Sequence, residues 1–534
     1  MAENWWDEAV IYEVYVRSFA DSNGDGVGDL CGVIEHLDHL VSLGVDGLWL
    51  TPFYPSPMAD HGYDVADPRA VEPVFGNLAD FDALASAAHR RGLRLVVDVV
   101  PNHTSSHHPW FRSALATPAG SLERARYVFA DGRGPGGTSP PNNWRSVFGG
   151  PAWSRVRSAA GDDRQWYLHL FAPEQPDLNW SHPDVLDDLR GTLRFWRERG
   201  VDGFRIDVAH GLAKAPGLPD MQGEAGILAV TADDPRFDQP AVHAIWREVR
   251  HTLDEIGAIA IGEVWVDSQQ SLARYVRDDE LNLAFDFRLL LASWDPAALR
   301  AAVAGGLAVN RRTWAVENHD RDRLSARYGG GATGAARARA MSLLMLALPG
   351  SVYLYQGQEL GLPQVDIAPQ FRQDPVWERS GHRQAGRDGC RVPLPWTGQT
   401  PPYGFSAPGS EAPWLPIPTG WGPMTVQAQT GRPDSTLALH RAALSARQKL
   451  LIGQDFGWLP APEGVLAFRR GPVVCVLNAG SAAARLDHAE LGLRGQVRVV
   501  PGLASHAGQG TAADPSRLPP DAAMWLVADV GDTR

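Results

Sequence analysis

The chain has 534 residues, with 62 Asp and Glu against 49 Lys and Arg, and its formal net charge is −13. A field of this sign repels polyanions, so the composition argues against binding to nucleic acid or to acidic membranes. Hydrophobic residues make up 44% of the chain, which is ample for a core. The length predicts about two to four domains.

The three cysteines, Cys31, Cys390 and Cys475, are odd in number and far apart, which favours a reducing compartment over a disulfide framework. The amino terminus, MAENWWDEAV, lacks a basic region followed by an apolar one. The most apolar run, Leu343 to Leu348, is much shorter than the ~20 residues of a membrane span. We therefore expect a cytoplasmic protein with no membrane partner.

Short apolar runs alternate with helical patterns that end in glycine. A first helical face over 33–41 stops at Gly44, and a second over 185–196 stops at Gly200. Such alternation is typical of βα units around a parallel sheet. Eight strands are expected, at 9–16, 46–53, 93–100, 203–208, 258–265, 283–287, 313–320 and 351–357. The fold class is therefore α/β, a (β/α)₈ or TIM barrel.

Two irregular stretches interrupt this alternation, and the pattern changes near the carboxyl terminus. We expect a first part of the barrel over 1–103, an inserted subdomain after the third strand over 104–170, and the rest of the barrel over 171–456. A Pro- and Trp-rich insertion over 361–425 follows the eighth strand, and long ordered insertions are usually functional. Short apolar runs over 457–534 predict a C-terminal antiparallel β domain.

Carboxylates stand at the ends of several expected strands. Asp207, Glu263 and Asp320 end three of them, and Asp98 lies within a fourth. Active sites of such barrels lie at the carboxyl ends of the strands. Arg205 is two residues before Asp207 and therefore on the same side of its strand. A single carboxylate of this kind is as often a helix cap or an arginine partner, which is our interpretation of Asp98; three together predict a shared site.

These residues belong to runs that resemble the four signature regions of the α-amylase superfamily, glycoside hydrolase family 13. The runs are DVVPNH (98–103), GFRIDVAH (203–210), EVW (263–265) and VENHD (316–320). The segments at 5–30 and 386–396 narrow the resemblance to the bacterial α-glucosidase and oligo-1,6-glucosidase branch. The resemblance implies a barrel, a domain inserted after the third strand and a C-terminal β domain.

The resemblance also implies roles for the three carboxylates. Asp207 is expected to be the nucleophile, Glu263 the general acid and then base, and Asp320 the carboxylate that binds sugar hydroxyls. Retaining hydrolysis needs two carboxyl groups about 5–5.5 Å apart, one ionised and one protonated. We expect Arg205 to keep Asp207 ionised, and the neighbours of Glu263 to raise the pKa of that side chain.

Further site residues follow from the same resemblance. His103 and His319 are expected to hydrogen-bond the glucose unit, with Tyr63 as its stacking platform. Asp64 and Arg391 are expected to clamp the terminal sugar and thereby favour exo attack. Val208, after the nucleophile, is similar to the residue found in α-1,6-preferring relatives, although one side chain gives only about 1–3 kcal/mol of discrimination.

A loop near the amino terminus spaces oxygen donors as a hard cation requires. Asp21, Asn23, Asp25 and Asp29 supply side chains at positions 1, 3, 5 and 9, and Val27 supplies a carbonyl at position 7. The closing glutamate of a full EF-hand loop is missing, and an Asp- and Gly-rich turn without an ion is the alternative. The resembling family carries a structural Ca²⁺ in this loop, so we expect one here.

The expected function is that of a retaining exo-α-glucosidase that releases glucose from the non-reducing end of small α-glucosides through a covalent glucosyl-enzyme. One alternative is a transglucosylase or isomerase that passes the same intermediate to a sugar, as in trehalose synthases or sucrose isomerases. A second is a non-catalytic scaffold like the heavy chains of amino-acid transporters. That alternative requires no intact catalytic set and includes a membrane anchor, neither of which fits this sequence.

Overall fold

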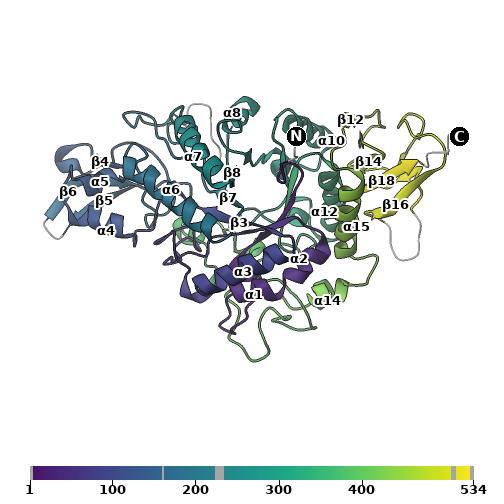
Figure 1. Cartoon of the computed structure of the whole chain (residues 1–534), viewed down its shortest axis with the longest axis horizontal. Coiled ribbons are helices and arrows are strands. Elements are labelled where there is room, and N and C mark those ends of the chain that lie inside the picture. Colours follow the sequence, from purple (N-terminus) through teal and green to yellow (C-terminus); the bar gives the residue numbers. More distant parts are fainter. Residues whose placement is uncertain (1–3, 159–160, 223–233, 267, 507–512, 529–534) are drawn as a thin grey trace.

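The computed structural model describes residues 4–158, 161–222, 234–266, 268–506 and 513–528. Eight parallel strands form one sheet that curls into a nearly closed barrel, in the order β10-β11-β1-β2-β3-β7-β8-β9 (Figure 1). All eight coincide with expected strands, so the predicted barrel is confirmed. The strands are β1 (Val10–Val14), β2 (Gly47–Leu50), β3 (Arg94–Val99), β7 (Gly203–Ile206), β8 (Ile259–Gly262), β9 (Leu283–Ala284), β10 (Thr313–Ala315) and β11 (Ser351–Tyr355).

Side chains of the barrel strands alternate between two separate hydrophobic clusters. On β3, Leu95 and Val97 pack in the large outer cluster under the helices, whereas Val96 lies in a smaller cluster inside the barrel. On β1, Ile11 is likewise inside while Val10 and Tyr12 are outside. Because strand side chains alternate with period two, residues 13 and 98 also face the interior.

Helices cover the outside of the barrel. The predicted apolar face of α6 (Pro183–Glu198) is confirmed, since Val185, Leu189, Leu193 and Trp196 are buried. The helix α2 (Leu37–Leu43) ends at Gly44, whose φ of 94° is one that glycine adopts at little cost. The long helices besides α6 are α3 (Leu78–Arg90), α7 (Val242–Ile256), α10 (Pro296–Leu307), α12 (Gly331–Ala347) and α15 (Thr436–Leu450). Shorter ones are α1 (Leu30–Glu35), α4 (Pro109–Ala116), α5 (Leu122–Ala125), α8 (Gln269–Tyr275), α9 (Arg288–Leu291), α11 (Leu324–Arg327), α13 (Pro375–Arg379) and α14 (Val426–Gln429).

Two smaller β units lie at opposite ends of the molecule (Figure 1). After β3 the chain forms an antiparallel sheet in the order β4-β6-β5, from β4 (Phe129–Asp131), β5 (Trp153–Ser158) and β6 (Gly161–Leu168). At the other end is a five-stranded antiparallel sheet in the order β12-β13-β14-β18-β16, from β12 (Phe456–Trp458), β13 (Val465–Arg470), β14 (Val473–Asn478), β18 (Ala522–Ala528) and β16 (Val497–Ala504). The pair β15 (Ala484–Arg485) and β17 (Arg517–Leu518) completes this unit.

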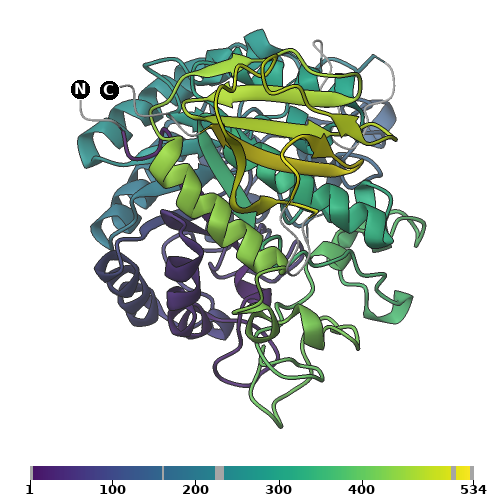
Figure 2. The ribbon, with the colours of Figure 1, turned by 90° about the vertical axis from the view of Figure 1, so that its right-hand side faces the viewer.

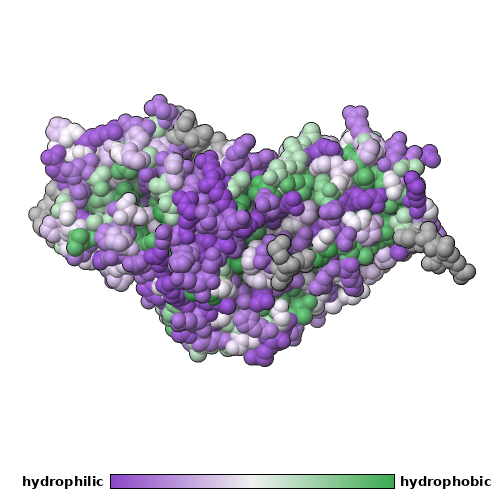
Figure 3. Space-filling model, turned by 45° about the horizontal axis from the view of Figure 1, so that its top comes forward, coloured by the Kyte–Doolittle hydropathy of each residue, from purple (hydrophilic) through white to green (hydrophobic). Residues whose placement is uncertain are grey.

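The C-terminal sheet packs on the helices α12 and α15, as the turned view shows (Figure 2). Trp525 of β18 is buried there, and its Nε1 donates a hydrogen bond to the carbonyl oxygen of Leu343 in α12 at 3.0 Å. The face drawn in Figure 3 is hydrophilic over much of its middle. Among the described helices, none combines the length and the apolar character needed to cross a bilayer.

A side chain bridges β9 and β10, where the described strands share no backbone ladder. The Thr313 hydroxyl donates to the carbonyl oxygen of Ala284 at 2.7 Å and accepts the Asp286 N–H at 3.0 Å. The residue is buried, so water cannot replace either bond. This one hydroxyl therefore bridges the seam of the barrel.

We expect Thr313→Val to destabilise the protein by about 1–3 kcal/mol, because the isosteric side chain leaves a buried N–H and a buried carbonyl without partners. The melting temperature, followed by fluorescence, should fall. Thr313→Ser keeps the hydroxyl and is the matched control. Its melting temperature should fall less than that of the Val variant. Equal melting temperatures for the Val variant and the wild type would contradict the bridging role.

Candidate active site

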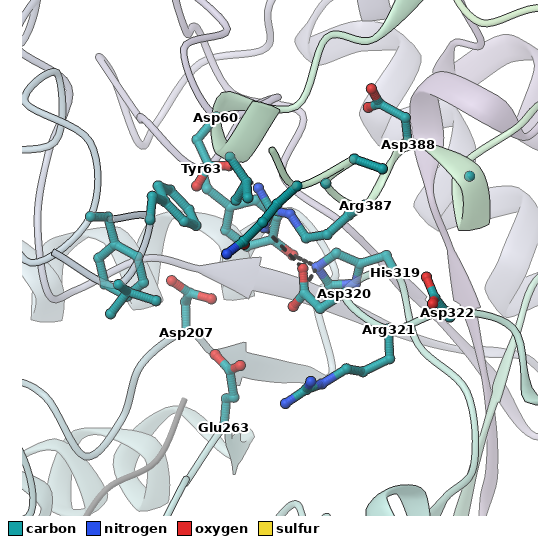
Figure 4. Close-up of a pocket in the computed structure, with 18 of the residues that line it drawn as sticks. Asp60, Tyr63, Asp207, Glu263, His319, Asp320, Arg321, Asp322, Arg387 and Asp388 are labelled. Atoms are coloured by element: carbon teal, nitrogen blue, oxygen red, sulfur yellow. Dashed lines mark hydrogen bonds and ion pairs between the residues drawn. The ribbon is translucent and has the colours of Figure 1, made fainter. Parts of the chain in front are cut away.

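The carboxyl ends of the barrel strands bring the predicted carboxylates together. Asp207 directly follows β7 and Glu263 directly follows β8, and both continue the inward-facing register of their strands. In Figure 4 these two side chains lie next to each other on one side of a pocket and face Asp320 and Arg387. The cavity measures about 680 Å³ and is lined by seven predicted residues, Tyr63, His103, Asp207, Val208, Glu263, His319 and Asp320.

Arg205 lies beneath these carboxylates as a buried cation, 2% exposed. Its Nη1 donates to Asp207 Oδ1 at 2.5 Å and to Asp98 Oδ1 at 3.1 Å, and its Nη2 lies 3.0 Å from Glu263 Oε2. A guanidinium is a rigid fork of donors, so its three partners are held in one fixed arrangement. Asp98 is thus an arginine partner, as the sequence suggested.

One positive charge cannot balance three buried carboxylates. Burial raises the pKa of Asp207 well above its usual range, and the charges of Glu263 and Asp98 add to this effect against the opposing influence of Arg205. Burial likewise raises the pKa of Asp98 to about 6 in spite of Arg205. The cluster therefore retains a shared proton more readily than isolated carboxylates would.

Glu263 differs from the expectation of a raised pKa. Burial acts to raise it, but Arg205 and hydrogen bonds from Trp265 and Val208 outweigh burial and lower the pKa of Glu263. The Trp265 Nε1–H donates to Oε1 at 2.9 Å and the Val208 N–H to Oε2 at 3.0 Å. Hydrogen bonds to both oxygens favour the carboxylate, which the sequence neighbours alone did not reveal.

Val208 makes this contact from a strained backbone. Its φ is 46°, in the left-handed region that β-branched residues rarely adopt. That conformation directs its N–H to Glu263, while the residue also lines the cavity. Strain of this kind persists where the surroundings over-determine it, often at functional sites.

Asp320 on the opposite wall is held by cations. Its Oδ1 accepts from Arg391 Nη2 at 2.9 Å and from Arg387 Nη1 at 3.1 Å, and its Oδ2 lies 3.4 Å from His319 Nε2. Burial acts to raise its pKa, but His319 and the two arginines outweigh burial and lower the pKa of Asp320 well below its usual range. Asp320 is therefore a permanent carboxylate at neutral pH.

The aromatic residues expected to bind the sugar surround this wall. Tyr63 is stacked on His319, with ring centroids 5.4 Å apart and planes at 11°. The Nε2 of His103 lies 3.1 Å from the carbonyl oxygen of Tyr63 and 3.1 Å from Gln175 Nε2. Burial lowers the pKa of His103 to about 4, so this imidazole is neutral at pH 7.

The predicted clamp of Asp64 and Arg391 is not formed. Asp64 is buried away from the cavity lining, where it accepts hydrogen bonds from Ser56 and from the N–H groups of residues 59 and 60. Arg391 lies behind Asp320 rather than against Asp64. Instead Asp60 and Arg387, each four residues earlier, line the cavity and pair at 2.7 Å.

Sequence reasoning missed both members of this pair. Each stands in the same irregular loop as the residue that was chosen, so the residue types were right and the positions were not. Asp374, which binds Arg387 Nε at 2.5 Å, holds the guanidinium from the other side. In a loop without a repeat, no periodic pattern distinguishes a residue from one of the same type four positions away.

The remaining walls of the cavity mix polar and apolar side chains, and most of the apolar ones come from outside the barrel. Phe148 and Phe171 belong to the 104–170 region and its exit, Phe237 to the segment after β7, and Val365 and Ile367 to the insertion after β11. Phe148, Val208 and Phe237 also share one hydrophobic cluster. The insertion over 361–425 therefore contributes to the site, as its length suggested.

The expected calcium loop is compact and well hydrogen-bonded. Gly24 and Gly26 adopt φ of 84° and 83°, and the Asp21 carboxylate accepts the N–H groups of both. Asp29 accepts from Ser22 and from the Gly32 N–H at the start of α1. Each carboxylate keeps lone pairs for a hard cation. Within the described residues, no three His, Cys, Asp or Glu side chains are grouped as metal ligands, and the ion stays a prediction.

The two positions Asp60 and Asp64 allow a direct test. Asp60→Asn should lower kcat/KM for small α-glucosides, the substrates that the resemblance implies, by about 10- to 100-fold, because it removes a charge-assisted pair worth about 1.5–3 kcal/mol. Asp64→Asn should mainly lower the melting temperature, because its amide cannot accept all three hydrogen bonds. A larger loss of kcat/KM in the Asp64 variant would contradict this assignment.

Comparison with known proteins identifies the family of the chain. A family model described as "Alpha amylase, catalytic domain" matches residues 13–454. A probable alpha-glucosidase of Rhizobium meliloti (strain 1021) is 38% identical over 514 residues, covering 90% of each chain. A trehalose-6-phosphate hydrolase of Escherichia coli (strain K12) is 36% identical over 511 residues, covering 88% of each.

Among solved structures, the alpha-glucosyl transfer enzyme XgtA superposes with a TM-score of 0.86 at 37% identity, covering 98% of this chain and 99% of that one. The family match runs from within β1 to the end of the barrel and includes the carboxylates at the strand ends, and the relatives span nearly the whole chain. The resemblance seen in the sequence is therefore confirmed: the chain belongs to the α-amylase family, glycoside hydrolase family 13, and is a glycoside hydrolase of its α-glucosidase branch.

Proposed function

We propose that this protein is a retaining, exo-acting α-glucosidase that releases glucose from the non-reducing end of short α-glucosides. The observation that carries the proposal is that one guanidinium, that of Arg205, binds both Asp207 and Glu263 at the floor of one cavity. The rigid fork keeps the two carboxyl groups close, which fits the separation of about 5–5.5 Å for retaining enzymes better than the about 6.5–9.5 Å of inverting ones.

In the first step, Asp207 attacks C1 of the glucose unit, and the glycosidic oxygen leaves with the proton of Glu263. A covalent β-glucosyl ester on Asp207 results. In the second step, Glu263 takes a proton from water, the water oxygen attacks C1, and the ester bond to Asp207 breaks. Two inversions at C1 give α-glucose.

The protonation state of the free site fits this scheme only if one proton moves within the cluster. In the free site, burial and the neighbouring carboxylates raise the pKa of Asp207, whereas Arg205 and two hydrogen bonds outweigh burial and lower the pKa of Glu263. A glucoside that fills the cavity excludes water and places a glycosidic oxygen beside Glu263. We infer that binding transfers the shared proton to Glu263 and leaves Asp207 as the nucleophile.

The Asp60 and Arg387 pair supports exo attack. Both residues line the cavity, and Arg387 also binds Asp320 at 3.1 Å and Asp374 at 2.5 Å. A chain of charges across one end of the cavity leaves no path for further sugar units on that side. The pair offers carboxylate and guanidinium groups to the hydroxyls of a terminal glucose.

A second candidate is transfer of the glucosyl group to a sugar or another alcohol. The apolar wall of Phe171, Val208 and Phe237 favours it, because an apolar surface beside the intermediate holds an acceptor ring better than it orders water. The structural relative XgtA is named as an alpha-glucosyl transfer enzyme. Both activities share the intermediate on Asp207.

One experiment distinguishes these outcomes. When maltose or isomaltose is followed by ¹H NMR, we expect α-glucose as the first sugar released, with α-linked oligosaccharides accumulating at high substrate if transfer competes. Asp207→Asn should lower kcat by roughly 10⁴-fold. Its melting temperature should stay equal or rise, because a buried carboxylate with a raised pKa is replaced by a neutral group. Initial release of β-glucose would contradict retention.

We also propose that the loop Asp21–Asp29 binds Ca²⁺ and that the protein works in the cytoplasm. Three cysteines without disulfide partners, Cys31, Cys390 and Cys475, support the second proposal. The first rests on four side-chain oxygen donors within nine residues. The loop does not line the cavity, so the bound ion would take no part in the reaction.

Calcium removal should therefore lower stability rather than activity. At a Ca²⁺ concentration 100-fold above Kd, binding stabilises a protein by about 2.7 kcal/mol, so EDTA treatment should lower the melting temperature and added Ca²⁺ should restore it. Asp25→Ala should abolish this response. A melting temperature that does not change with EDTA and Ca²⁺ would contradict the calcium site.

A further inference from the structure

Glu13 is a buried carboxylate that the reaction scheme does not use. It belongs to β1, faces the interior of the barrel and is 1% exposed. Among the described side chains, the one that hydrogen-bonds its carboxylate is His319, through Nδ1. A buried charge without a counter-charge is very costly, so this single partner must supply most of the compensation.

The ring of His319 cannot turn away from Glu13. It is stacked between Tyr15, with ring centroids 5.8 Å apart, and Tyr63, with ring centroids 5.4 Å apart. With Nδ1 on Glu13, the opposite nitrogen Nε2 faces the cavity wall. There it lies 2.8 Å from the Tyr63 hydroxyl and 3.4 Å from Asp320 Oδ2.

The hydrogen bonds around the Tyr63 hydroxyl indicate the protonation state of the His319 imidazole. Asp98 receives donors only, from Arg205, from Trp49 Nε1 at 3.2 Å and from the Tyr63 hydroxyl at 3.1 Å. The single hydroxyl proton of Tyr63 is donated to Asp98 Oδ2, and this assignment makes His319 Nε2 the donor to the Tyr63 oxygen. The Nδ1 also donates, because a carboxylate only accepts.

We propose that Glu13 is a positioning residue that keeps His319 protonated on both ring nitrogens, so that its single Nε2–H stays at the cavity wall, directed to the Tyr63 oxygen, with the ring's charge beside Asp320. The inference rests on the proposed function, because it assigns Asp320 to the sugar. Other charged or titratable groups face the Glu13 and His319 pair from neighbouring strands and loops, namely Tyr15, Asp98, Arg205, Tyr355 and Arg391.

A protonated His319 has a defined effect on the site. Against burial, it is the largest of the influences that lower the pKa of Asp320. It therefore keeps Asp320 ionised and fixes the orientation of its Oδ2. Hydrogen bonds that sugar hydroxyls donate to carboxylates strengthen in the transition state of retaining hydrolysis, so the contribution of Glu13 should appear mainly in kcat.

The test replaces the charge of Glu13 and keeps its shape. Glu13→Gln retains an acceptor for Nδ1 but loses the negative charge, and we expect kcat on maltose or isomaltose to fall about 10- to 100-fold with KM changed little, as for other partners that orient a functional histidine. The matched control is Glu359→Gln. Glu359 is also buried and contacts a histidine, His39 Nε2 at 3.3 Å, but does not line the cavity. It should keep wild-type kcat.

Two results would overturn the proposal. One is a Glu13→Gln variant with wild-type kcat, even if Glu13→Ala is inactive, because orientation without charge would then suffice. The other is an equal loss of kcat in the Glu359→Gln control.

A second measurement does not depend on activity, and its decisive spectrum is that of the wild type. The wild-type protein should show a low-field ¹H NMR signal from the Nδ1–H of His319 that is lost in His319→Gln. Its absence from the wild type would refute the pair. A protein that shows the signal but hydrolyses no α-glucoside would refute the proposed function alone.

Discussion

The site depends on one buried guanidinium. Arg205 contacts Asp98, Asp207 and Glu263 together, and each of these comes from a different strand of the barrel. Without this cation, three carboxylates within hydrogen-bonding reach of one point would repel one another in a region of low dielectric. With it, the cluster still keeps an excess negative charge, which together with burial raises the pKa of Asp98 and Asp207. This incomplete charge balance is built into the parallel register of β3, β7 and β8, which aligns Asp98 with Arg205.

The segments that follow the barrel strands shape the cavity above the Arg205 cluster. The inserted unit after β3, the segment after β7 and the insertion after β11 each contribute wall residues. Their sequences are irregular, and their hydrophobic contacts are with one another as much as with the barrel. The division is physical: strands fix the reacting groups within a rigid ladder, whereas loops set the shape of the space above them.

The sequence was informative where a period exists. Alternation within one strand placed Arg205 and Asp207 on one side, and the apolar stripe of α6 was found from its helical period. The inference failed where contacts depend on loop geometry. Asp60 and Arg387 were confused with Asp64 and Arg391, and the three donors that hold Glu263 ionised include a backbone N–H from the strained Val208. Glu13 was overlooked because an acidic residue inside an apolar strand carries no signal of its partner, which is 306 residues away.

The seam of the barrel has a dynamic consequence. Every other pair of adjacent strands is joined by backbone hydrogen bonds among the described residues, whereas β9 and β10 depend on the Thr313 hydroxyl. Amide groups in such a junction open at lower cost than those within a continuous ladder. Hydrogen–deuterium exchange should therefore be fastest there among the barrel strands, close to the loop that carries Asp320 after β10.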